Sequence, residues 1–327
     1  MSGLLDRALD LAVIPGYSRI GFSARGLDRK PIGGSLRGRT ALVTGGSSGI
    51  GEAACEGLAA AGARVYMLVR DEARGESAVS RIESRLPGAS GTIELEICDL
   101  SDLSSIRRFA EGFQARCDRL DLLVNNAGIL PEERTHTADG VELTFATNVL
   151  GPFLLTSLLL PTLLAAAPAR VITVSSGGMY TARLDAEDPQ LERRPYDGPR
   201  FYAHAKRAQV PLNRVWAEGC PAERIGFHAL HPGWVDTPGL RSSLPRFRRL
   251  MRPLLRDARQ GADTVVWLGT YPELDPATGG FWHDRTPRPD HRLPWTRETA
   301  GERERLWREC ERLSTASTAT RAGIPIC

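Results

Sequence analysis

A tyrosine and a lysine four residues apart, Tyr202 and Lys206, form the pair best suited to acid–base chemistry in this 327-residue sequence. In a helix the two side chains would lie on one face, one turn apart. A phenol has an ordinary pKa of about 10, and a nearby cation favours its ionised form by about 1–3 units. Tyr202 is therefore a candidate acid for a carbonyl under reduction, or a candidate base for an alcohol under oxidation.

A glycine-rich turn in the stretch 40–51, TALVTGGSSGIG, is the second candidate for chemistry. The apolar run 41–43 is typical of a buried parallel strand, and Gly45, Gly49 and Gly51 follow it at a spacing that allows a tight turn and a helix start. Such a turn aims backbone N–H groups and a helix N-terminus at a phosphate. An ordinary strand-to-helix connection would contain the same glycines, so both interpretations stay open here.

Arg70 indicates which dinucleotide such a turn would bind. It follows the apolar run 64–69 and lies 70 − 51 = 19 residues after Gly51, near the position where an acid would bind the ribose hydroxyls of an unphosphorylated dinucleotide. A guanidinium at this position can pair with a 2′-phosphate instead. A solvated surface arginine is the alternative interpretation.

Small and polar residues follow the later apolar runs, where the ligand of a parallel sheet would bind. Asp99 and Leu100 come after the third run, and the sequence 125–128, Asn-Asn-Ala-Gly, comes after the fourth. These residues suit the close approach of a nucleotide, but Asn and Gly also form ordinary turns. The fifth run ends in Ser175 and Ser176.

Alternating strand and helix patterns must position these residues. The expected strands are 40–44, 64–69, a run that ends at Cys98, 120–124, 170–174 and 225–230. The expected helices include 49–61, one that ends near Leu86, and one that begins near Tyr202 after a polar loop over 177–200. This order predicts an α/β fold with a right-handed, doubly wound parallel sheet, the Rossmann fold.

No charged residue occurs between residues 142 and 170, which raises the question of a membrane-spanning helix. Asn148, Gly151, Pro152 and Pro161 interrupt this stretch, and the apolar segments between them are shorter than a bilayer requires. The stretch therefore predicts a long helix that is buried in the protein.

Composition fits one globular domain with an extension at each end, because 42% of the residues are hydrophobic and 25% are charged. We expect the extensions at 1–38 and 286–327 and the domain at 39–285. A net charge of +3 does not call for a nucleic-acid partner. The cysteines are scattered without metal-ligand or redox spacing: Cys55, Cys98, Cys117, Cys220, Cys310 and Cys327. This cysteine pattern is typical of a reducing environment, so we expect a cytoplasmic location. The histidines and carboxylates provide no metal set, so we expect no metal.

The N-terminal extension begins with an amphipathic pattern, because five apolar residues share one helical face: Leu4, Leu5, Ala8, Leu9 and Ala12. Pro15 and Gly16 should end this helix, and the basic, glycine-containing run up to Gly38 is typical of a flexible arm. Docking of the helix on the protein's own surface is the first interpretation. Contact of residues 1–14 with a membrane or a partner is the second.

Taken together, six ordered motifs resemble the short-chain dehydrogenase/reductase superfamily over residues 40–270. They are Thr44-Gly45-x-x-x-Gly49-x-Gly51, Asn125-Asn126-Ala127-Gly128, Asn148, Ser176, Tyr202-x-x-x-Lys206 and Pro232-Gly233. The longer stretches 171–179, 231–239 and 260–264 are similar to the group called dehydrogenase/reductase member 12.

The resemblance implies a role for each matching residue. Ser176 would hold the substrate oxygen, Tyr202 would transfer the proton, Lys206 would bind the ribose and lower the pKa of the tyrosine, and Asn148 would hold a water of the proton relay. Thr237 would contact the nicotinamide end of the cofactor. The implied cofactor contacts are Gly45, Ser47, Ser48, Gly49, Ile50, Gly51, Arg70, Asp99, Leu100, Asn126, Ala127, Gly128, Tyr202, Lys206, Pro232, Gly233, Val235 and Thr237.

Two features depart from the family pattern. Ser176 and Tyr202 are 202 − 176 = 26 residues apart, about twice the usual interval, so the loop between them should reshape the pocket or a subunit contact. Ser48 stands where many NADP-dependent members have a basic residue. Arg70 would therefore select the 2′-phosphate with less help. A homodimer through the helix after Asn125 and the Tyr202 helix is a further expectation.

A basic, amphipathic segment near 237–259 is expected to cover the substrate; we call residues 237–259 the lid. Its apolar residues at helical spacing are Phe247, Leu250, Met251 and Leu254, and its arginines include Arg246, Arg248, Arg249, Arg252 and Arg256. These arginines could face solvent, an anionic substrate group or, over 241–259, an anionic membrane. The sequence as a whole predicts an NADP(H)-dependent oxidoreductase for an apolar carbonyl or secondary alcohol. The alternative is a nucleotide-binding sensor or scaffold without turnover.

Overall fold

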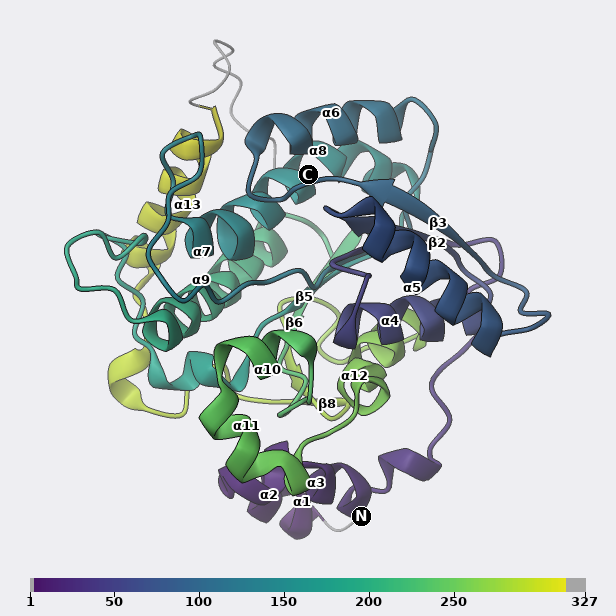
Figure 1. The fold of residues 1–327 in the computed structure, drawn as a ribbon, viewed down its shortest axis with the longest axis horizontal. Helices are drawn as coiled ribbons and strands as arrows, with labels where there is room; N and C mark the ends of the chain where they lie inside the picture. Colours follow the sequence, from purple (N-terminus) through teal and green to yellow (C-terminus); the bar gives the residue numbers. More distant parts are fainter. Residues whose placement is uncertain (1–2, 316–327) are drawn as a thin grey trace.

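Within residues 3–315, the chain folds around one sheet of eight strands with the order β3-β2-β1-β4-β5-β6-β7-β8 (Figure 1). The computed structural model describes residues 3–315. The strands are β1 (Thr40–Thr44), β2 (Arg64–Val69), β3 (Thr92–Ile97), β4 (Leu122–Asn125), β5 (Ala169–Val174), β6 (Ile225–Leu230), β7 (Phe281–His283) and β8 (Thr286–Pro287). All neighbours pair in parallel except β7 and β8. The predicted doubly wound α/β fold is confirmed, and the sequence missed β7 and β8.

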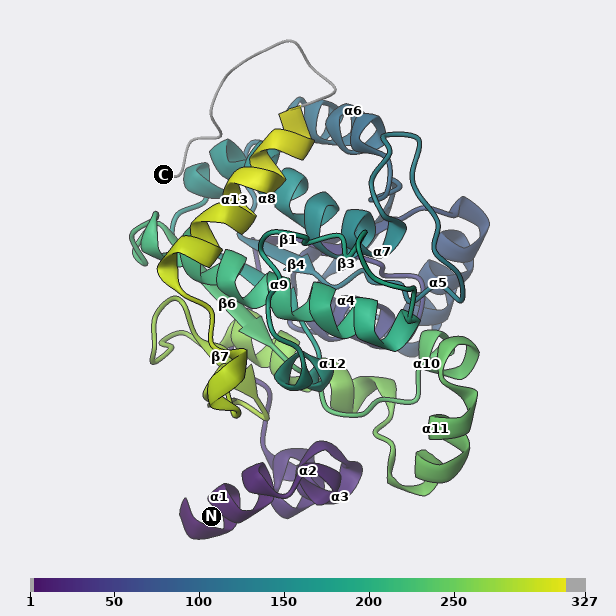
Figure 2. The same ribbon diagram turned by 90° about the vertical axis from the view of Figure 1, so that its left-hand side faces the viewer.

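Helices cover both faces of this sheet (Figures 1 and 2). On one face lie α4 (Gly49–Ala60), α5 (Glu72–Arg85) and α12 (Ala258–Thr270), and on the other lie α6 (Leu103–Gln114), α8 (Gly151–Ala165) and α9 (Gly198–Glu218). Leu42 belongs to the core under α6, α8 and α9, whereas Ala41 and Val43 belong to the core under α4 and α12. Side chains of a strand alternate between faces, so an uninterrupted apolar run serves both cores.

The register of the central strands brings their carboxyl ends to one edge. Val43 of β1 is paired with Val124 of β4, and Val124 is paired with Ile172 of β5. Gly45 and Ser175 therefore leave the sheet at the same edge. The strand order reverses between β1 and β4, and such a reversal is where ligands bind in sheets of this type.

The long uncharged stretch is a helix within the core. It comprises α7 (Leu143–Phe145), a π-helical turn η2 (Ala146–Leu150) and α8. By length and composition the stretch 143–165 could span a membrane, but 72% of its most apolar window is buried inside the protein. The structure thus agrees with the prediction of a buried helix.

Several boundaries differ from the sequence expectation. β3 ends at Ile97, and α9 begins at Gly198 instead of near Tyr202. The earlier start of α9 has a local cause, because the Asp197 side chain accepts a hydrogen bond from Arg200 N (3.0 Å) and caps the helix. The expected polar loop after β5 contains a 3₁₀ helix, η3 (Gly177–Thr181).

The N-terminal extension is more ordered than the sequence indicated. It forms α1 (Gly3–Leu11), α2 (Val13–Tyr17), α3 (Arg19–Ala24) and η1 (Leu27–Arg29) at one end of the molecule (Figures 1 and 2). The predicted first helix ends at Leu11, earlier than expected, and Pro15 and Gly16 lie within the second helix, α2. Much of the expected arm is helical, and a buried ion pair of Arg25 with Asp284 ties this segment to the domain.

The lid contains α10 (Pro238–Ser243), α11 (Pro245–Met251) and η4 (Arg252–Leu254), and η5 (Pro294–Thr296) precedes the last helix, α13 (Ala300–Thr315). Trp307 of α13 packs on Phe153 of α8 and Trp216 of α9, with ring centroids 4.9 and 4.6 Å apart. The same chain therefore occupies part of the surface that the resemblance assigned to a homodimer. Residues 316–327 of the expected C-terminal extension, including Cys327, lie outside the described residues.

Candidate active site

Helix α9 carries Tyr202 and Lys206 at the carboxyl edge of the sheet. The Lys206 Nζ atom lies 5.6 Å from the centroid of the Tyr202 ring and donates a hydrogen bond to the carbonyl of Val174, the last residue of β5 (2.8 Å). The lysine side chain is 2% exposed, and burial lowers its pKa to about 7. The predicted pair is thus assembled at the end of β5, as its spacing required.

Ser176 and Ser175 have different partners although they are neighbours. The Ser176 side chain lies near enough to the Tyr202 phenol to lower its pKa, and its Oγ accepts a hydrogen bond from Gly178 N at the start of η3 (3.2 Å). The buried Ser175 Oγ instead donates to the carbonyl of Lys206 (2.7 Å). Ser176 is therefore the serine that can meet a substrate, and Ser175 fixes β5 to α9.

The pKa of Tyr202 differs in direction from the expectation. Lys206 was expected to lower it, but burial of the phenol raises it to about 12, and the nearby Ser176 side chain only partly opposes this effect. Burial also leaves Lys206 with a pKa of about 7, so at neutral pH the lysine carries much less than a full charge. The phenol is consequently protonated at neutral pH in this form of the protein.

Asn148 lies in the π-helical turn η2, where the helical hydrogen-bond pattern is interrupted. Its side chain forms two hydrogen bonds with the backbone of Ile129, from Ile129 N to Oδ1 (2.8 Å) and from Nδ2 to Ile129 O (3.0 Å). A Cβ on Gly128 would lie 3.3 Å from Lys206 Nζ and 3.4 Å from Asn148 Oδ1. The segment after β4 thus lies directly against the lysine and the asparagine.

Gln209 was not singled out from the sequence, yet it also contacts this group. Its Nε2 donates to the carbonyl of Asn148 (2.6 Å), while its Oε1 is buried without a partner within residues 3–315. The available signal was its position seven residues after Tyr202, which places both on the same helical face. Gln209 thus holds the backbone of Asn148, the residue that the resemblance connects with the proton relay.

The glycine turn meets the geometric requirements of a phosphate site. Gly45 and Gly49 have φ values of 68° and 58°, which favour glycine, and a Cβ on Gly51 would lie 2.2 Å from the carbonyl of Gly45. Ser48 precedes α4, and its side chain makes no capping hydrogen bond within the described residues. By contrast, aspartates cap four other helices: Asp71, Asp102, Asp197 and Asp257. The N-terminus of α4 is therefore left available to an anion.

Asn126 and Thr44 fix the position of this turn. Thr44 Oγ1 accepts hydrogen bonds from Asn126 N and Ala127 N, both at 2.9 Å, and Asn126 Nδ2 donates to Thr44 O at 2.9 Å. The Asn126 side chain thus joins the end of β4 to the end of β1. A Cβ on Gly45 would lie 2.9 Å from the Cα of Ala127, so the two segments are in close contact.

The predicted contacts at the ends of β2 and β3 lie beside this turn along the sheet edge. Arg70 is exposed and forms no hydrogen bond or ion pair within the part of the chain that the structure describes. Asp99 Oδ1 accepts from both the backbone N and the Oγ of Ser101 (2.8 and 2.7 Å), and the Leu100 side chain is buried in the core. Arg70 is thus a guanidinium available to a ligand, whereas Leu100 could contact one only through its backbone.

The loop after β6 reaches the glycine turn from the opposite side. A Cβ on Gly49 would lie 3.0 Å from Cγ2 of Thr237, and Thr237 Oγ1 caps α10 by accepting from Leu240 N (3.2 Å). Gly233 in the same loop has a φ of 83°, and Val235 forms a β-bridge with Arg256. The structure therefore brings the loop 232–237 next to the start of α4.

The arginines of the lid, which were expected on its surface, differ from one another in exposure and in partners. The prediction that Arg256 lies on the surface is wrong, because its side chain is 1% exposed and pairs with Asp284 (2.6 Å). Arg241 and Arg248 both pair with Asp236 at 3.1 and 2.8 Å. The exposed arginines without such partners within residues 3–315 are Arg246, Arg249 and Arg252.

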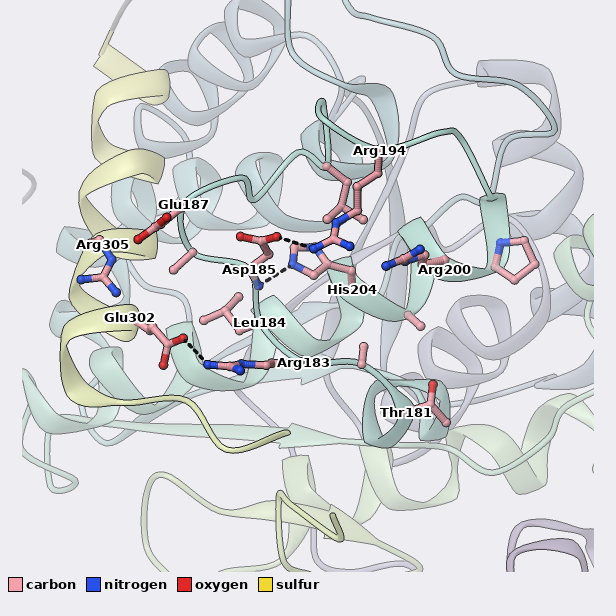
Figure 3. A pocket seen from close by; sticks show the side chains of 15 residues that line it. Thr181, Arg183, Leu184, Asp185, Glu187, Arg194, Arg200, His204, Glu302 and Arg305 are labelled. Atoms are coloured by element: carbon pink, nitrogen blue, oxygen red, sulfur yellow. Dashed lines mark hydrogen bonds and ion pairs between the residues drawn. The ribbon is translucent and has the colours of Figure 1, made fainter. Parts of the chain in front are cut away.

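A cavity of about 670 Å³ lies on the other side of α9 (Figure 3). His204 lines it, and Asp185 N donates to His204 Nε2 (3.0 Å). Burial lowers the pKa of His204 to about 4, so the ring is neutral. Arg194 pairs with Asp185 and Arg183 with Glu302 across the same space. Since Ser176, Tyr202 and Lys206 do not line it, this cavity is separate from the site above.

Similar proteins of known name and structure share most of this chain. The short chain dehydrogenase family matches residues 39–246. The human protein named Dehydrogenase/reductase SDR family member 12 is 40% identical over 302 residues, which cover 91% of this chain and 94% of that protein. Human Retinol dehydrogenase 12 is 38% identical over 265 residues and is matched over 82% of its length, with 80% of this chain covered.

Solved structures give the same result. A crystal structure of an uncharacterized protein from Mycobacterium Paratuberculosis has a TM-score of 0.67 and 30% identity, with 86% of this chain and 96% of that chain covered. The Pseudomonas aeruginosa RhlG/NADP active-site complex has a TM-score of 0.62 and 28% identity, with 77% and 96% covered. The family match and the identity to these relatives together show that this chain belongs to the short-chain dehydrogenase/reductase family of oxidoreductases.

Proposed function

We propose that this protein is an NADP(H)-dependent oxidoreductase that interconverts a carbonyl and a secondary alcohol of an apolar small molecule. One observation carries the proposal. Ser176, Tyr202 and Lys206 lie together at the end of β5, at the same edge of the sheet as the uncapped N-terminus of α4. This combination provides both a proton donor and an anion site, which is what a nicotinamide-dependent reaction requires.

The residues present fit a phosphorylated dinucleotide. Backbone N–H groups of 47–51 would bind its phosphates, because glycines allow the close approach and no acidic side chain caps the helix. Arg70 would bind the 2′-phosphate, since its guanidinium has no acid partner within residues 3–315. The name of the Pseudomonas aeruginosa relative includes NADP and supports the same choice. When bound, the cofactor supplies or accepts the hydride.

The side chains around Tyr202 would handle the proton and the substrate oxygen. Ser176 Oγ would donate a hydrogen bond to that oxygen, and the phenol, with a pKa of about 12, would give up its proton as negative charge develops there. A protonated phenol suits reduction of a carbonyl at neutral pH. Oxidation of an alcohol needs the phenolate, so we expect it to become faster as the pH rises.

The surroundings of the lid support an apolar substrate. The Phe247 ring of α11 packs edge-on against Trp234, with centroids 5.3 Å apart. Trp234 belongs to the loop after β6, which also contains Thr237 near the glycine turn. An apolar carbonyl compound could be covered by these rings and kept from water. Retinol dehydrogenases among the relatives are consistent with such a compound.

A panel of aldehydes, ketones, quinones, retinoids and steroids tests the proposal when NADPH oxidation is measured with each. The parent protein should turn over at least one class, and Tyr202→Phe should not. The alternative function, a nucleotide sensor without turnover, makes the opposite forecast: tight NADPH binding with no oxidation by any compound at any pH between 6 and 9. That result would reject the proposed enzymatic function.

A second proposal concerns an anionic membrane as a partner. Exposed apolar side chains occur on the N-terminal helices and on α11, which lie at the same end of the molecule (Figures 1 and 2). They are Leu11 (79% exposed), Val13 (44%), Ile14 (54%), Ile20 (50%) and Leu250 (78%). Exposed arginines that form no hydrogen bond or ion pair within residues 3–315 accompany them at Arg7, Arg19, Arg246, Arg249 and Arg252. Apolar side chains with arginines around them suit the interface of an anionic bilayer.

Vesicle co-sedimentation tests this partner. The protein should sediment with vesicles that contain phosphatidylserine and stay in solution with pure phosphatidylcholine. Leu11→Ser combined with Ile14→Ser should reduce binding, whereas Ile97→Ser, a change of an exposed apolar residue on β3, should not. Equal behaviour of the two variants would reject this surface.

A further inference from the structure

The N-terminal extension inserts one residue, Tyr17, between two loops of the candidate active site. Its side chain is 3% exposed. One loop begins at Gly177, directly after Ser176, and the other is the segment 231–234 after β6. The Tyr17 ring packs against the ring of His231 with centroids 4.1 Å apart, and against Trp234 with centroids 5.9 Å apart.

Contact with the first loop is closer than an alanine would allow. A Cβ added to Gly177 would lie 2.9 Å from Cε2 and 3.2 Å from Cδ2 of the Tyr17 ring. Gly177 does not have the positive φ that favours glycine. The position therefore needs glycine because the tyrosine ring occupies the space, and the ring sets the path of the backbone that follows Ser176.

The backbone of the extension holds the second loop. The Tyr17 carbonyl accepts a hydrogen bond from Trp234 N (2.8 Å). A Cβ on Gly233 would lie 2.7 Å from the same carbonyl and 2.5 Å from Arg256 Nε. The loop that carries the predicted cofactor contacts Pro232 and Gly233 is thus packed directly on residue 17.

Buried charges fix the extension in this position. Arg25 and Arg256 both pair with Asp284, at 2.7 and 2.6 Å, and both donate to the carbonyl of Gly16, at 3.0 and 3.2 Å. All three charged side chains are 1–2% exposed. Residue 17 is consequently attached to the last strands of the sheet through its neighbour, and its backbone cannot shift without disturbing a buried ion-pair network.

We propose that Tyr17 is a positioning residue of the active site, which sets the conformation of the Ser176–Gly177 turn and of the loop 231–234 at the same time. The inference rests on the proposed function for its catalytic consequence. Tyr17 would hold Ser176 in reach of Tyr202 and hold the loop at 232–237 beside the glycine turn. The N-terminal extension is then a part of the catalytic unit.

The ring carries this role and the hydroxyl does not. Tyr17 Oη is buried and has no hydrogen-bond partner within residues 3–315. Tyr17→Phe keeps the ring and removes an unsatisfied polar atom, so it should preserve activity and leave stability equal or higher. Tyr17→Ala removes the contacts with Gly177, His231 and Trp234 and should lower kcat by about 10- to 100-fold, the effect expected of a small misplacement of catalytic groups.

Gly177→Ala provides a test in the opposite direction. In the parent protein the new methyl group would collide with the Tyr17 ring, so kcat should fall. In the Tyr17→Ala background the space is empty, and Gly177→Ala should cause little further loss. Strong coupling between the two substitutions would locate the effect at this contact. Additive losses would show that the ring does not act through Gly177.

Amide hydrogen exchange tests the same inference without a measurement of turnover. Tyr17→Ala should raise the exchange rate in segments 175–178 and 231–235 and leave segments 64–69 and 122–125 of the sheet unchanged. Leu27→Ala, a buried substitution elsewhere in the extension, is the control: it should reduce stability but not raise exchange at 175–178. If Tyr17→Ala folds and both loops exchange as in the parent, the inference is rejected. If the parent protein shows no turnover but the exchange changes appear, the proposed function fails and the positioning role stands.

Discussion

The catalytic helix and the N-terminal extension are held in place by interactions of very different range. Tyr202 and Lys206 are four residues apart on one helix, so their proximity follows from helix geometry. The extension is fixed by Arg25, whose partner Asp284 is 259 residues away, and by Asp6, whose partner Arg288 is 282 residues away. The chemistry of the catalytic helix can therefore be predicted from the sequence. The attachment of the N-terminal extension depends on the complete fold.

The two regions also use charge in opposite ways. Around Tyr202, burial leaves a protonated phenol and a lysine with a pKa of about 7, so the site has little net charge. Around Asp284, burial alone would raise the pKa of the carboxyl, but His283, Arg256 and Arg25 lower it to about 2. Charge is thus suppressed where a proton must move and retained where a segment must be held.

The largest effect should come from removing the proton donor. Tyr202→Phe keeps the ring between Ser176 and Lys206 and should lower kcat by about 10³-fold or more, because general acid catalysis contributes about 10²–10⁴-fold. Affinity for NADPH should change less than about threefold, since the phenol acts in the transition state. Stopped-flow single turnover and cofactor titration measure the two values. Turnover near that of the parent would assign the proton to another group.

The next largest effect should come from breaking the attachment of the extension. Asp284→Ala leaves Arg25 and Arg256 buried without their carboxylate, and breaking a buried pair in this way costs about 3–5 kcal/mol of unfolding free energy. Glu94→Ala removes the exposed pair with Arg64 and should cost less than about 1 kcal/mol. Urea unfolding of both variants gives the comparison. Similar losses would mean that the buried network adds nothing beyond a surface pair.

Particular residues show why the sequence predicted one region and not the other. The observed ends of β2 and β6 agree with the predicted ends, because the apolar runs stop before Arg70 and His231. Arg256 was predicted on the surface, because no local pattern indicates Asp284 as its partner. The direction of the Tyr202 pKa was missed for the same reason, since spacing reveals a neighbouring lysine but not the burial that outweighs it.

The pH dependence of the unfolding free energy should distinguish the contribution of the histidines from that of the carboxylates. Burial lowers the pKa of His204 and His283 to about 4. The unfolded chain therefore binds more protons than the folded chain between pH 4 and 6.5, and stability should fall as the pH drops through this window. At pH 5 the loss should be about 2 kcal/mol for each histidine. Asp284, with a pKa of about 2, stays ionised there.

Urea unfolding at pH 7, 6 and 5 measures this slope. His283→Gln should flatten the slope by removing one of the four buried histidines with a lowered pKa, the others being His204, His228 and His231, even if it lowers stability at every pH. His136→Gln changes an exposed ring beside Glu192 and serves as the control for a general effect of losing a histidine. A slope in His283→Gln as steep as in the parent would mean that His283 does not bind the protons.

A smaller effect is expected at the cofactor end of the site. Arg70→Asp should weaken NADPH binding by about 10- to 100-fold, because a hydrogen bond to a charged group contributes about 1.5–3 kcal/mol. Affinity for NADH should be unchanged or higher. Arg108→Asp makes the same charge change on α6, where the arginine side chain is 71% exposed, and should affect the two cofactors equally. Equal affinity of the parent for NADPH and NADH would remove Arg70 from this role.

The smallest expected effect divides the lid into two functions. Phe247 packs on Trp234 beside the site, whereas Leu250 of the same helix is 78% exposed and points away from the core. The sequence predicts that both residues cover the substrate; without a substrate, Phe247 packs on Trp234, whereas Leu250 is exposed. Phe247→Ser should raise KM for apolar carbonyls by about 3- to 10-fold, equivalent to burial of part of one aromatic ring, with NADPH affinity unchanged.

Leu250→Ser should leave KM unchanged and reduce sedimentation with phosphatidylserine vesicles. The two substitutions are on one helix and three residues apart, so a general disturbance of α11 would alter both measurements in both variants. Crossed results, with KM changed only by Phe247→Ser and vesicle binding changed only by Leu250→Ser, would show that these two neighbouring side chains have separate functions. If Leu250→Ser raises KM as much as Phe247→Ser does, the exposed residue closes over the substrate during turnover, and the membrane surface must then be sought on the N-terminal helices alone.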